Sequence, residues 1–353
     1  MLLASARPRL AVISLYLWLL VRLVGAPASS FGSRTVELPL QSLIEPSTQK
    51  LHDAAILDFQ EWLHDEGLPL TVNNLLEAPT ILSRLLVAYG QYMYSSRKPR
   101  FLFLICVTAM QRYQPALKPY FKSVWQLATN WRLVEPVNHR HPIPVTLVKA
   151  MIALALTTGS SRWAGVTILS FWGLARIGEV LKALRCHLLL PKDILFAATD
   201  RTFLHYDKPK SRNRGGASHQ HSLIRGLGFA NMLSHIFADL KNTDRLYSLS
   251  PATYRSRWNK FLKFLGVPSA TGFTPGGLRG GGAVASYMSD MPIPDIMWRM
   301  RVSSTNTLEH YLQEVAALTS LRSLPKRSVS MIIEFAVLFD ATFHHFSSNA
   351  SQK

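Results

Sequence analysis

Apolar residues recur every three or four positions from Ser47 to about Glu135. Leu51, Ala55 and Phe59 illustrate the spacing, and residues 81–94 repeat it. Residues at these intervals fall on one face of an α-helix, where they can be buried together. We therefore predict an all-helical bundle over residues 47–135.

A proline-broken basic stretch follows this bundle. Glu135-Pro136 leads into residues 139–144, which alternate histidine, arginine and proline. Such a segment suits a linker between two domains, so a second domain is expected over residues 144–324. Helical spacing returns at residues 145–157 and 163–187, and Arg176 and Glu179 then fall on one face of the latter helix.

Short apolar runs after Pro191 indicate strands. Residues 194–196 and 203–206, separated by Thr199-Asp200-Arg201, predict a β-hairpin, and residues 222–224 predict a third strand. From Leu227 onward the pattern is helical, apart from a glycine-rich piece at residues 274–282. The predicted fold class is α-rich α+β: a helical domain, then a mixed domain with a small antiparallel sheet.

The chain is strongly basic. Its 353 residues carry a formal net charge of +18, with a sequence pI near 10.2. A polyanionic partner is therefore expected, and nucleic acid is favoured over an anionic membrane surface. Three basic clusters could contact DNA phosphates, although each one alone also suits a solvated surface. They are Lys208, Lys210, Arg212 and Arg214; Arg255, Arg257, Lys260 and Lys263; and Arg299 with Arg301.

The cysteines and the first segment bear on the cellular compartment. Cys106 and Cys186 are the only cysteines, and both lie in apolar runs, so they are interpreted as reduced core residues. Residues 1–30 form a hydrophobic leader in which two arginines precede an apolar run and small residues, as in a signal peptide. Arg22 and the short run argue against a spanning helix. An export signal and a leader without an export role both remain open.

Four motifs occur in a suggestive order. They are Gly173-Leu174-Ala175-Arg176-Ile177-Gly178-Glu179, Lys208-Pro209-Lys210-Ser211, Gly277-Leu278-Arg279, and Thr307-Leu308-Glu309-His310-Tyr311-Leu312. In this order the chain resembles the tyrosine recombinases, or phage integrases, over residues 144–324. The helical bundle before them is similar to the core-binding domain of that family. The glycine-rich piece resembles recombinases of eukaryotic mobile elements.

The resemblance implies a site for DNA strand transfer. Arg176 and Arg279 would hold the non-bridging oxygens of a phosphodiester, with Glu179 in support. Lys210 would protonate the leaving 5′ oxygen, and Tyr311 would form a 3′-phosphotyrosine that conserves the bond for rejoining. The family needs neither metal nor cofactor for this chemistry.

The resemblance also implies partners and a location. Double-stranded DNA is the expected partner, and a homo-oligomer on DNA is the implied assembly. Residues 331–339 of the 325–353 tail are apolar enough to pass to a neighbouring protomer. The chain is expected inside the cell, in the nucleus if its source is eukaryotic, rather than at a membrane.

Two positions depart from the family. Gly276 stands where the family has the His of His-x-x-Arg, and Val302 stands at the later His or Trp position. Neither side chain can transfer a proton or donate a hydrogen bond. His219 or His221, beside the lysine hairpin, could compensate. Two alternatives therefore stay open: an active strand transferase, and an inactive DNA-binding remnant of a mobile-element recombinase.

Overall fold

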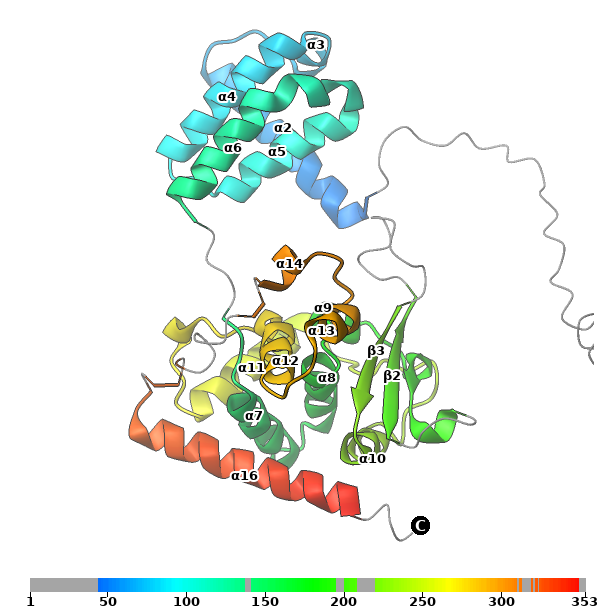
Figure 1. Ribbon diagram of the computed structural model, residues 1–353. Coiled ribbons are helices and arrows are strands. Elements are labelled where there is room, and N and C mark those ends of the chain that lie inside the picture. The colour runs from blue at the N-terminus through cyan, green and yellow to red at the C-terminus, as the bar shows by residue number, and fades with distance from the viewer. Residues whose placement is uncertain are drawn as a thin grey trace, which may run out of the picture. The chain divides into compact units, whose positions relative to one another are not determined.

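The computed structural model describes residues 44–136, 141–194, 200–207, 220–309, 311–312, 319, 321–322 and 324–348. The leader at residues 1–30 lies outside them. The chain divides into two compact units, residues 1–131 and 132–353 (Figure 1). Each unit is described by itself.

The first unit is helical throughout its described part, as its apolar spacing predicts. Its core is aromatic, with the rings of Phe59 and Tyr89 packed edge to face at 5.1 Å and Trp62 5.3 Å from Tyr89. Proline stands in the first turn of the helices that begin at Pro46 and Pro79, where its missing N–H leaves no hydrogen bond unmade. The elements are α2 (Pro46–Asp65), α3 (Val72–Leu76), α4 (Pro79–Ser95), α5 (Arg100–Tyr113), the 3₁₀ helix η1 (Pro115–Phe121) and α6 (Lys122–Val134).

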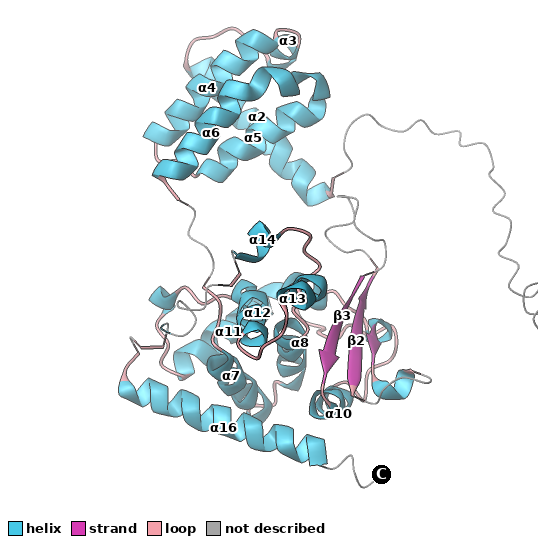
Figure 2. Cartoon of the chain, viewed as in Figure 1, coloured by secondary structure: helices cyan, strands magenta, loops and turns pink. Residues whose placement is uncertain are grey.

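The second unit combines helices with one small sheet (Figure 2). Its helices are α7 (Val145–Thr157), α8 (Ser161–Trp172), α9 (Ile177–Val180), α10 (Leu227–Ile236), α11 (Pro251–Phe264), α12 (Leu278–Tyr287), α13 (Ile293–Met300), α14 (Thr305–Glu309) and α16 (Lys326–Ser348). The strands are β1 (Leu188–Leu189), β2 (Arg201–Tyr206) and β3 (Gln220–Arg225), and the 3₁₀ helices are η2 (Arg185–His187), η3 (Pro191–Asp193), η5 (Ser269–Thr271) and η6 (Pro275–Gly277). This confirms the α-rich α+β class.

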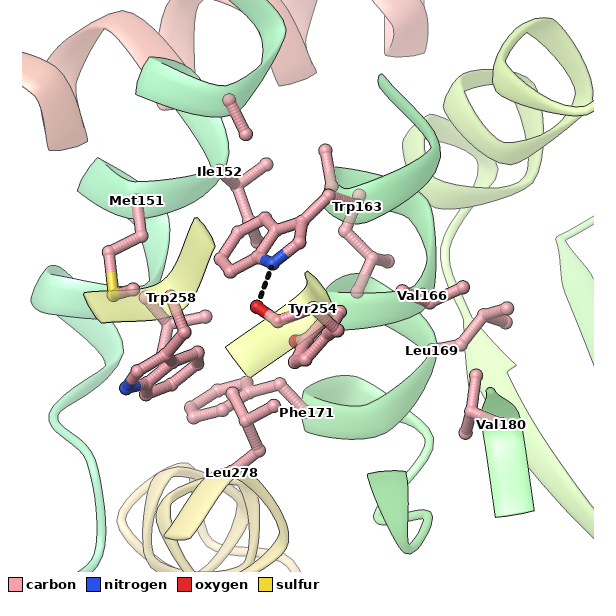
Figure 3. Close-up of a cluster of buried hydrophobic side chains, with 14 of the residues drawn as sticks. Met151, Ile152, Trp163, Val166, Leu169, Phe171, Val180, Tyr254, Trp258 and Leu278 are labelled. Atoms are coloured by element: carbon pink, nitrogen blue, oxygen red, sulfur yellow. Dashed lines mark hydrogen bonds between the residues drawn. The ribbon is translucent and has the colours of Figure 1, made fainter. Parts of the chain in front are cut away.

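The core of the second unit centres on Trp163 of α8. Its indole stacks on the ring of Tyr254 at 5.2 Å and meets Phe261 edge to face at 4.8 Å. The indole N–H donates to the carbonyl oxygen of Tyr254 (Figure 3). The Tyr254 hydroxyl lies 2.8 Å from the hydroxyl of Thr167. Every polar atom that these large side chains bring into the core therefore has a partner, which avoids a desolvation penalty.

Helix α16 packs along α7 and α10 of the same chain (Figure 1). Phe339 stacks on Trp172 at 5.6 Å, and the ammonium of Lys149 on α7 lies 2.7 Å from the Asp340 carboxylate. By length and composition α16 could also span a membrane, a test that soluble core helices pass too. The apolar stretch at residues 331–339 supplies the face that packs in cis.

The sheet is antiparallel in the order β1-β2-β3. Strand β2 pairs with β3 from Arg201 opposite Arg225 to Tyr206 opposite Gln220. The first strand is Leu188–Leu189, which pairs with Phe203 and Leu204, so the expected strand at residues 194–196 was wrong in its described residue, Ile194. Arg201 also belongs to a strand and not to a turn.

The helix predicted over residues 163–187 is broken. Helix α8 ends at Trp172, and Leu174 takes a left-handed conformation with φ +50°. The N–H of Ala175 then bonds to the carbonyl of Ser170 at 3.1 Å, a six-residue closure typical of helix ends. Leu174 is not a glycine, so its left-handed conformation could not be predicted from its residue type.

Two smaller expectations also differ from the structure. Cys186 is exposed, while Cys106 is buried as expected. The core of the second unit also includes Ile143, just before the predicted domain start, because that residue is fully buried against the glycine-rich helix α12.

Candidate active site

The left-handed turn at Leu174 sets the position of Arg176. After this turn the chain is extended at Arg176 (φ −72°, ψ 125°), and α9 begins at the next residue. The Arg176 side chain is 32% exposed, and its Nη1 donates to Glu179 Oε1 at 3.1 Å. The pairing of Arg176 with Glu179 follows from their spacing of three residues in the first turn of a helix.

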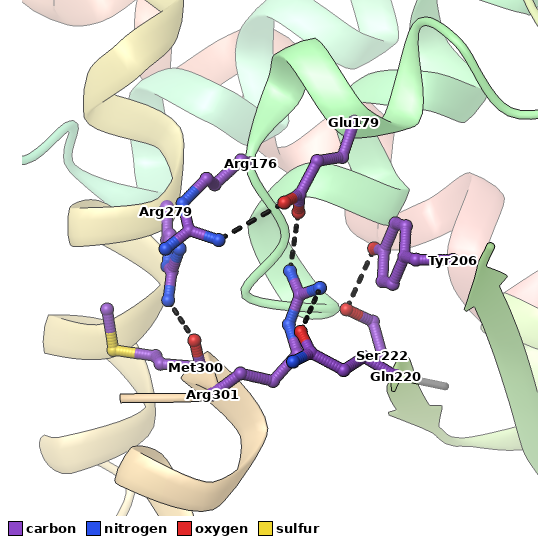
Figure 4. A network of polar contacts seen from close by, with 8 residues as sticks. All are labelled: Arg176, Glu179, Tyr206, Gln220, Ser222, Arg279, Met300 and Arg301. Carbon is purple, nitrogen blue, oxygen red and sulfur yellow. Dashed lines mark hydrogen bonds and ion pairs between the residues drawn. The ribbon is translucent and has the colours of Figure 1, made fainter. Parts of the chain in front are cut away.

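Arg279 lies in the first turn of α12 and is almost fully buried, with 3% exposure. One of its Nη groups donates to the carbonyl oxygen of Met300 (Figure 4). Its Nε and Nη1 have no hydrogen-bond partner among the residues that the structure describes. These two buried nitrogen atoms of a charged group therefore need hydrogen-bond acceptors from outside the described residues.

The environment of Arg279 disfavours its positive charge. Burial in the first place, and then the neighbouring charge of Arg176, lower the pKa of Arg279 to about 10 from the usual 12.5. It remains protonated at neutral pH. Figure 4 shows the Arg176 and Arg279 side chains next to one another, although they come from different helices.

The backbone of α12 approaches other segments closely. A Cβ atom at Gly281 would overlap the carbonyl oxygen of Ile143, and its distance to the Ile143 nitrogen would be 2.9 Å. A Cβ at Gly282 would overlap the carbonyl oxygen of Phe171 at the end of α8. Glycine therefore permits the close helix packing that seats Arg279 beside Arg176.

Tyr311 joins the two arginines. The Arg279 guanidinium carbon lies 5.6 Å from the centroid of the Tyr311 ring, within cation–π range. The ring also lies against α12, since a Cβ at Gly280 would be 3.5 Å from Tyr311 Cδ1. The structure thus brings together Arg176, Glu179, Arg279 and Tyr311, as the order of the motifs predicted.

The departures from the family motif lie near the same group. Gly276 lies in η6, one turn before Arg279. Val302 packs against a small apolar cluster around Leu308, against which Tyr311 also packs. Val302 therefore contributes only apolar contact at this place.

The group contains an arginine that sequence reasoning put on the surface. The Arg301 side chain is 8% exposed, and its Nη2 donates to Glu179 Oε2 at 2.6 Å. Arg301 was expected on a DNA-contacting surface, but its guanidinium turns inward to the buried Glu179 carboxylate, which corrects the surface placement. Tyr206 and Gln220, which also contact Arg301, were not foreseen either.

Arg299 likewise has a structural environment. Its Nη2 donates to the carbonyl oxygens of Trp172 and Leu223 at 2.9 and 2.7 Å, which ties α13 to α8 and β3. Burial lowers its pKa. A guanidinium used in this way does not present itself to a phosphate, which corrects the surface interpretation of this cluster.

The second basic cluster lies on α11. Arg255, Lys260 and Lys263 are exposed and Arg257 is half-buried, while Trp258 on the same helix is in the core. Among the described residues, none of these four basic side chains bonds to the arginine group. They form a separate basic surface on the second unit.

The lysine hairpin cannot be placed. Lys208, Lys210, Arg212, Arg214 and His219 lie outside the described residues. His221 is on β3, where strand alternation puts it on the opposite sheet face from Gln220 and Ser222. Partial burial, and then the charges of His205 and Arg301, lower its pKa. His221 therefore does not take the place of the missing His beside Arg279.

No three His, Cys, Asp or Glu side chains in the described part of the chain are grouped to hold a metal ion. Asp193 pairs with Arg185 at 3.0 Å, and Asp207 with His187 at 2.8 Å. In the described site, the charges that face an incoming anion are therefore guanidinium groups. Two of them beside a phenol can bind a tetrahedral phosphoryl group and place a hydroxyl near it.

Comparison with known proteins was made at three levels. No family model and no curated protein matches this chain. Similar solved structures include the XerA recombinase, which is 13% identical with a TM-score of 0.38 and coverage of 80% of this chain and 94% of that one. The integrase of transposon Tn1549, in complex with circular intermediate DNA, is 10% identical with a TM-score of 0.43 and coverage of 73% and 94%. A lambda integrase dimer bound to a core site is 13% identical with a TM-score of 0.44 and coverage of 88% and 89%.

All three neighbours are recombinases or integrases. They belong to the class that the sequence motifs resemble.

Proposed function

We propose that this chain binds duplex DNA and holds one phosphodiester between Arg176 and Arg279, with Tyr311 as the nucleophile of a strand-transfer reaction. The observation that carries the proposal is that Nε and Nη1 of buried Arg279 have no hydrogen-bond partner among the described residues, next to a second arginine and a tyrosine ring. A buried charge without a compensating partner destabilises the folded protein by about 3–5 kcal/mol. A bound phosphate would supply the missing charge and acceptors.

The proposed reaction is a transesterification. The Tyr311 oxygen attacks phosphorus and loses its proton, the bond from phosphorus to the 5′ oxygen breaks, and a 3′-phosphotyrosine forms. Arg176 and Arg279 stabilise the charge that develops on the non-bridging oxygens. We assign the protonation of the leaving oxygen to Lys210 from the motif order. The free 5′ hydroxyl of the same or another strand reverses the step.

The wider setting follows from this proposal. A strand transferase joins two DNA ends and therefore acts as a homo-oligomer on DNA. The protein would act on DNA inside the cell, in the nucleus if the source is eukaryotic. The glycine-rich motif suggests an origin in a mobile element. The helical first unit and the basic face of α11 would add phosphate contacts of the kind that do not depend on sequence.

A second candidate function is DNA binding without cleavage. The observation that favours it is the apolar packing of Val302 at the position where the family has His or Trp, together with Gly276 before Arg279. Proton-transfer groups contribute about a hundred- to ten-thousand-fold to a rate. Their loss could leave the arginine site intact and the chemistry too slow to detect.

The test has two stages. Purified full-length chain is titrated with a mixed-sequence duplex at several salt concentrations; binding that weakens steeply with salt supports phosphate recognition, and binding that is absent at low salt overturns it. A pool of nicked duplexes with a random central region is then used to trap a covalent adduct on a denaturing gel. An adduct that disappears in Tyr311→Phe supports the transferase. Binding without any adduct supports the DNA-binding remnant.

A further inference from the structure

Arg301 has an unusual place for a residue at the end of a helix. It closes α13 in a left-handed conformation with φ +57°, and its N–H bonds to the carbonyl of Trp298. A non-glycine residue in this conformation is held there by its surroundings. The consequence is that its side chain turns into the protein instead of into solvent (Figure 4).

The Arg301 guanidinium is fixed from several sides. Its carbon atom lies 4.3 Å from the centroid of the Tyr206 ring, and its Nη1 lies 3.4 Å from Gln220 Oε1. The Tyr206 hydroxyl lies 2.9 Å from that of Ser222, and burial raises the pKa of Tyr206 to about 12, so the ring stays neutral. Arg301 is thereby held against the end of β2 and the start of β3.

The Glu179 carboxylate is shared between two arginines. Oε1 accepts from Arg176 at 3.1 Å, and Oε2 accepts from Arg301 at 2.6 Å. The shorter contact is to the more deeply buried arginine, since the exposed fractions of the two side chains are 32% and 8%. Arg301 therefore makes the stronger ion pair with Glu179.

This sharing decides the charge of the site. Among the described residues of the site, three guanidinium groups (Arg176, Arg279 and Arg301) face the single carboxylate of Glu179, two of them in direct contact with it, so two positive charges are in excess. Without Arg301, Glu179 would turn both of its oxygens to Arg176 and neutralise it. A neutralised Arg176 would be a poor ligand for an anion.

We propose that Arg301 is a positioning residue that occupies Glu179 and so keeps Arg176 available to bind phosphate. The inference rests on the proposed function and adds a residue that acts through Glu179 without touching the phosphate. It makes the anion affinity of Arg176 depend on a charge balance. That balance can be tested by removing either charge, or both.

The probe is inorganic phosphate, and its binding to the full chain is measured by phosphorus NMR. Arg301→Gln is expected to weaken phosphate binding about tenfold, which corresponds to a single charge-assisted contact. Adding Glu179→Gln to Arg301→Gln is expected to restore binding to within about threefold of the unmodified chain, because the excess of two positive charges returns. A purely structural Arg301 predicts the opposite, since the second substitution removes a further contact.

Arg299→Gln is the matched control. Arg299 is another buried arginine of α13, but its bonds go to backbone carbonyls. This variant should lose stability and still bind phosphate within about twofold of the unmodified chain, the scatter expected of a site left intact. If Arg301→Gln does not fold by circular dichroism, Arg301→Lys replaces it; the lysine keeps the charge but not the planar fork, and Glu179→Gln should again improve its binding.

The outcomes separate this inference from the function on which it rests. Arg279→Gln must weaken phosphate binding far more than Arg301→Gln does if the proposed site is real; unchanged binding in Arg279→Gln overturns the proposed function. If Arg279→Gln loses binding while Arg301→Gln keeps it, or if Glu179→Gln brings no recovery, the role of Arg301 is overturned and the site itself stands.

Discussion

The buried guanidinium of Arg279 lies 5.6 Å from the ring centroid of Tyr311. The two residues come from separate motifs, and the aromatic face favours the positive charge of Arg279. Removing or screening either member should therefore change how the site responds to anions and to pH.

Phosphate binding should weaken as the pH rises above about 10. The pKa of Arg279 is lowered to about 10 by burial, so its guanidinium is charged below this pH and becomes neutral above it. Only the charged form binds an anion well, so the affinity for phosphate should fall as the pH increases. Titrations between pH 8 and pH 11 measure it. The residual binding of Arg279→Gln should lack this decline, and the same decline in both proteins would contradict the assignment.

Gly281→Ala should destabilise the second unit by about 1–3 kcal/mol, the usual range for overpacking. A methyl group there would overlap the Ile143 carbonyl, and the atoms nearest to it are backbone atoms that cannot rotate away. Urea unfolding measures the change. Gly178→Ala is the control, because nothing lies within 4 Å of its added Cβ; alanine in a helix should be neutral or stabilising by up to about 1 kcal/mol. Equal losses in the two variants would mean that the contact with Ile143 is not tight.

Tyr254→Phe should lower the free energy of unfolding by about 1 kcal/mol, the net contribution of one buried hydrogen bond. The hydroxyl lies 2.8 Å from that of Thr167, which also donates to the carbonyl of Trp163 and so keeps one partner. Thermal and urea unfolding provide the measurement. Tyr287→Phe, at an exposed tyrosine, should leave stability unchanged. A loss well above this value would show that ring packing changed as well.

Gly276→His with Val302→Trp should increase covalent trapping of nicked DNA. The two changes restore side chains of the types that the family carries there, and each such group contributes about a hundred- to ten-thousand-fold. Adduct yield on a denaturing gel measures the gain. The same double variant with Tyr311→Phe must give no adduct. If the repaired chain traps no more DNA than this control while both still bind duplex, the arginine group only binds DNA.

The sequence predicted the features that depend on local spacing. The helical first unit follows from intervals of three and four, and the Arg176–Glu179 pair from an interval of three. The order of the motifs correctly anticipated that Arg279 and Tyr311 would meet. The helical unit and the Arg176–Glu179 pair depend on residues that repeat or that lie within one turn of each other, and the Arg279–Tyr311 pair depends on the order of the motifs.

The features that it could not predict depend on distant partners. Leu174 and Arg301 adopt left-handed conformations that glycine usually takes, and neither residue type signals this. Strand β1 has only two residues and exists because β2 pairs with it, so its leucines were not predicted as a strand. The inward turn of Arg301 was missed for the same reason, since Glu179 and Tyr206 lie far away in sequence.

The contact of α12 with Ile143 and Phe171 has one more consequence. Main chain packs directly on main chain there, so the position of Arg279 depends mainly on backbone contacts. Such a scaffold preserves its geometry while the residues around it diverge, provided that the glycines remain. Related chains can therefore lose proton-transfer groups and still keep the geometry that would bind phosphate. In such chains, the glycines of α12 are a better indicator of phosphate binding than the reactive residues.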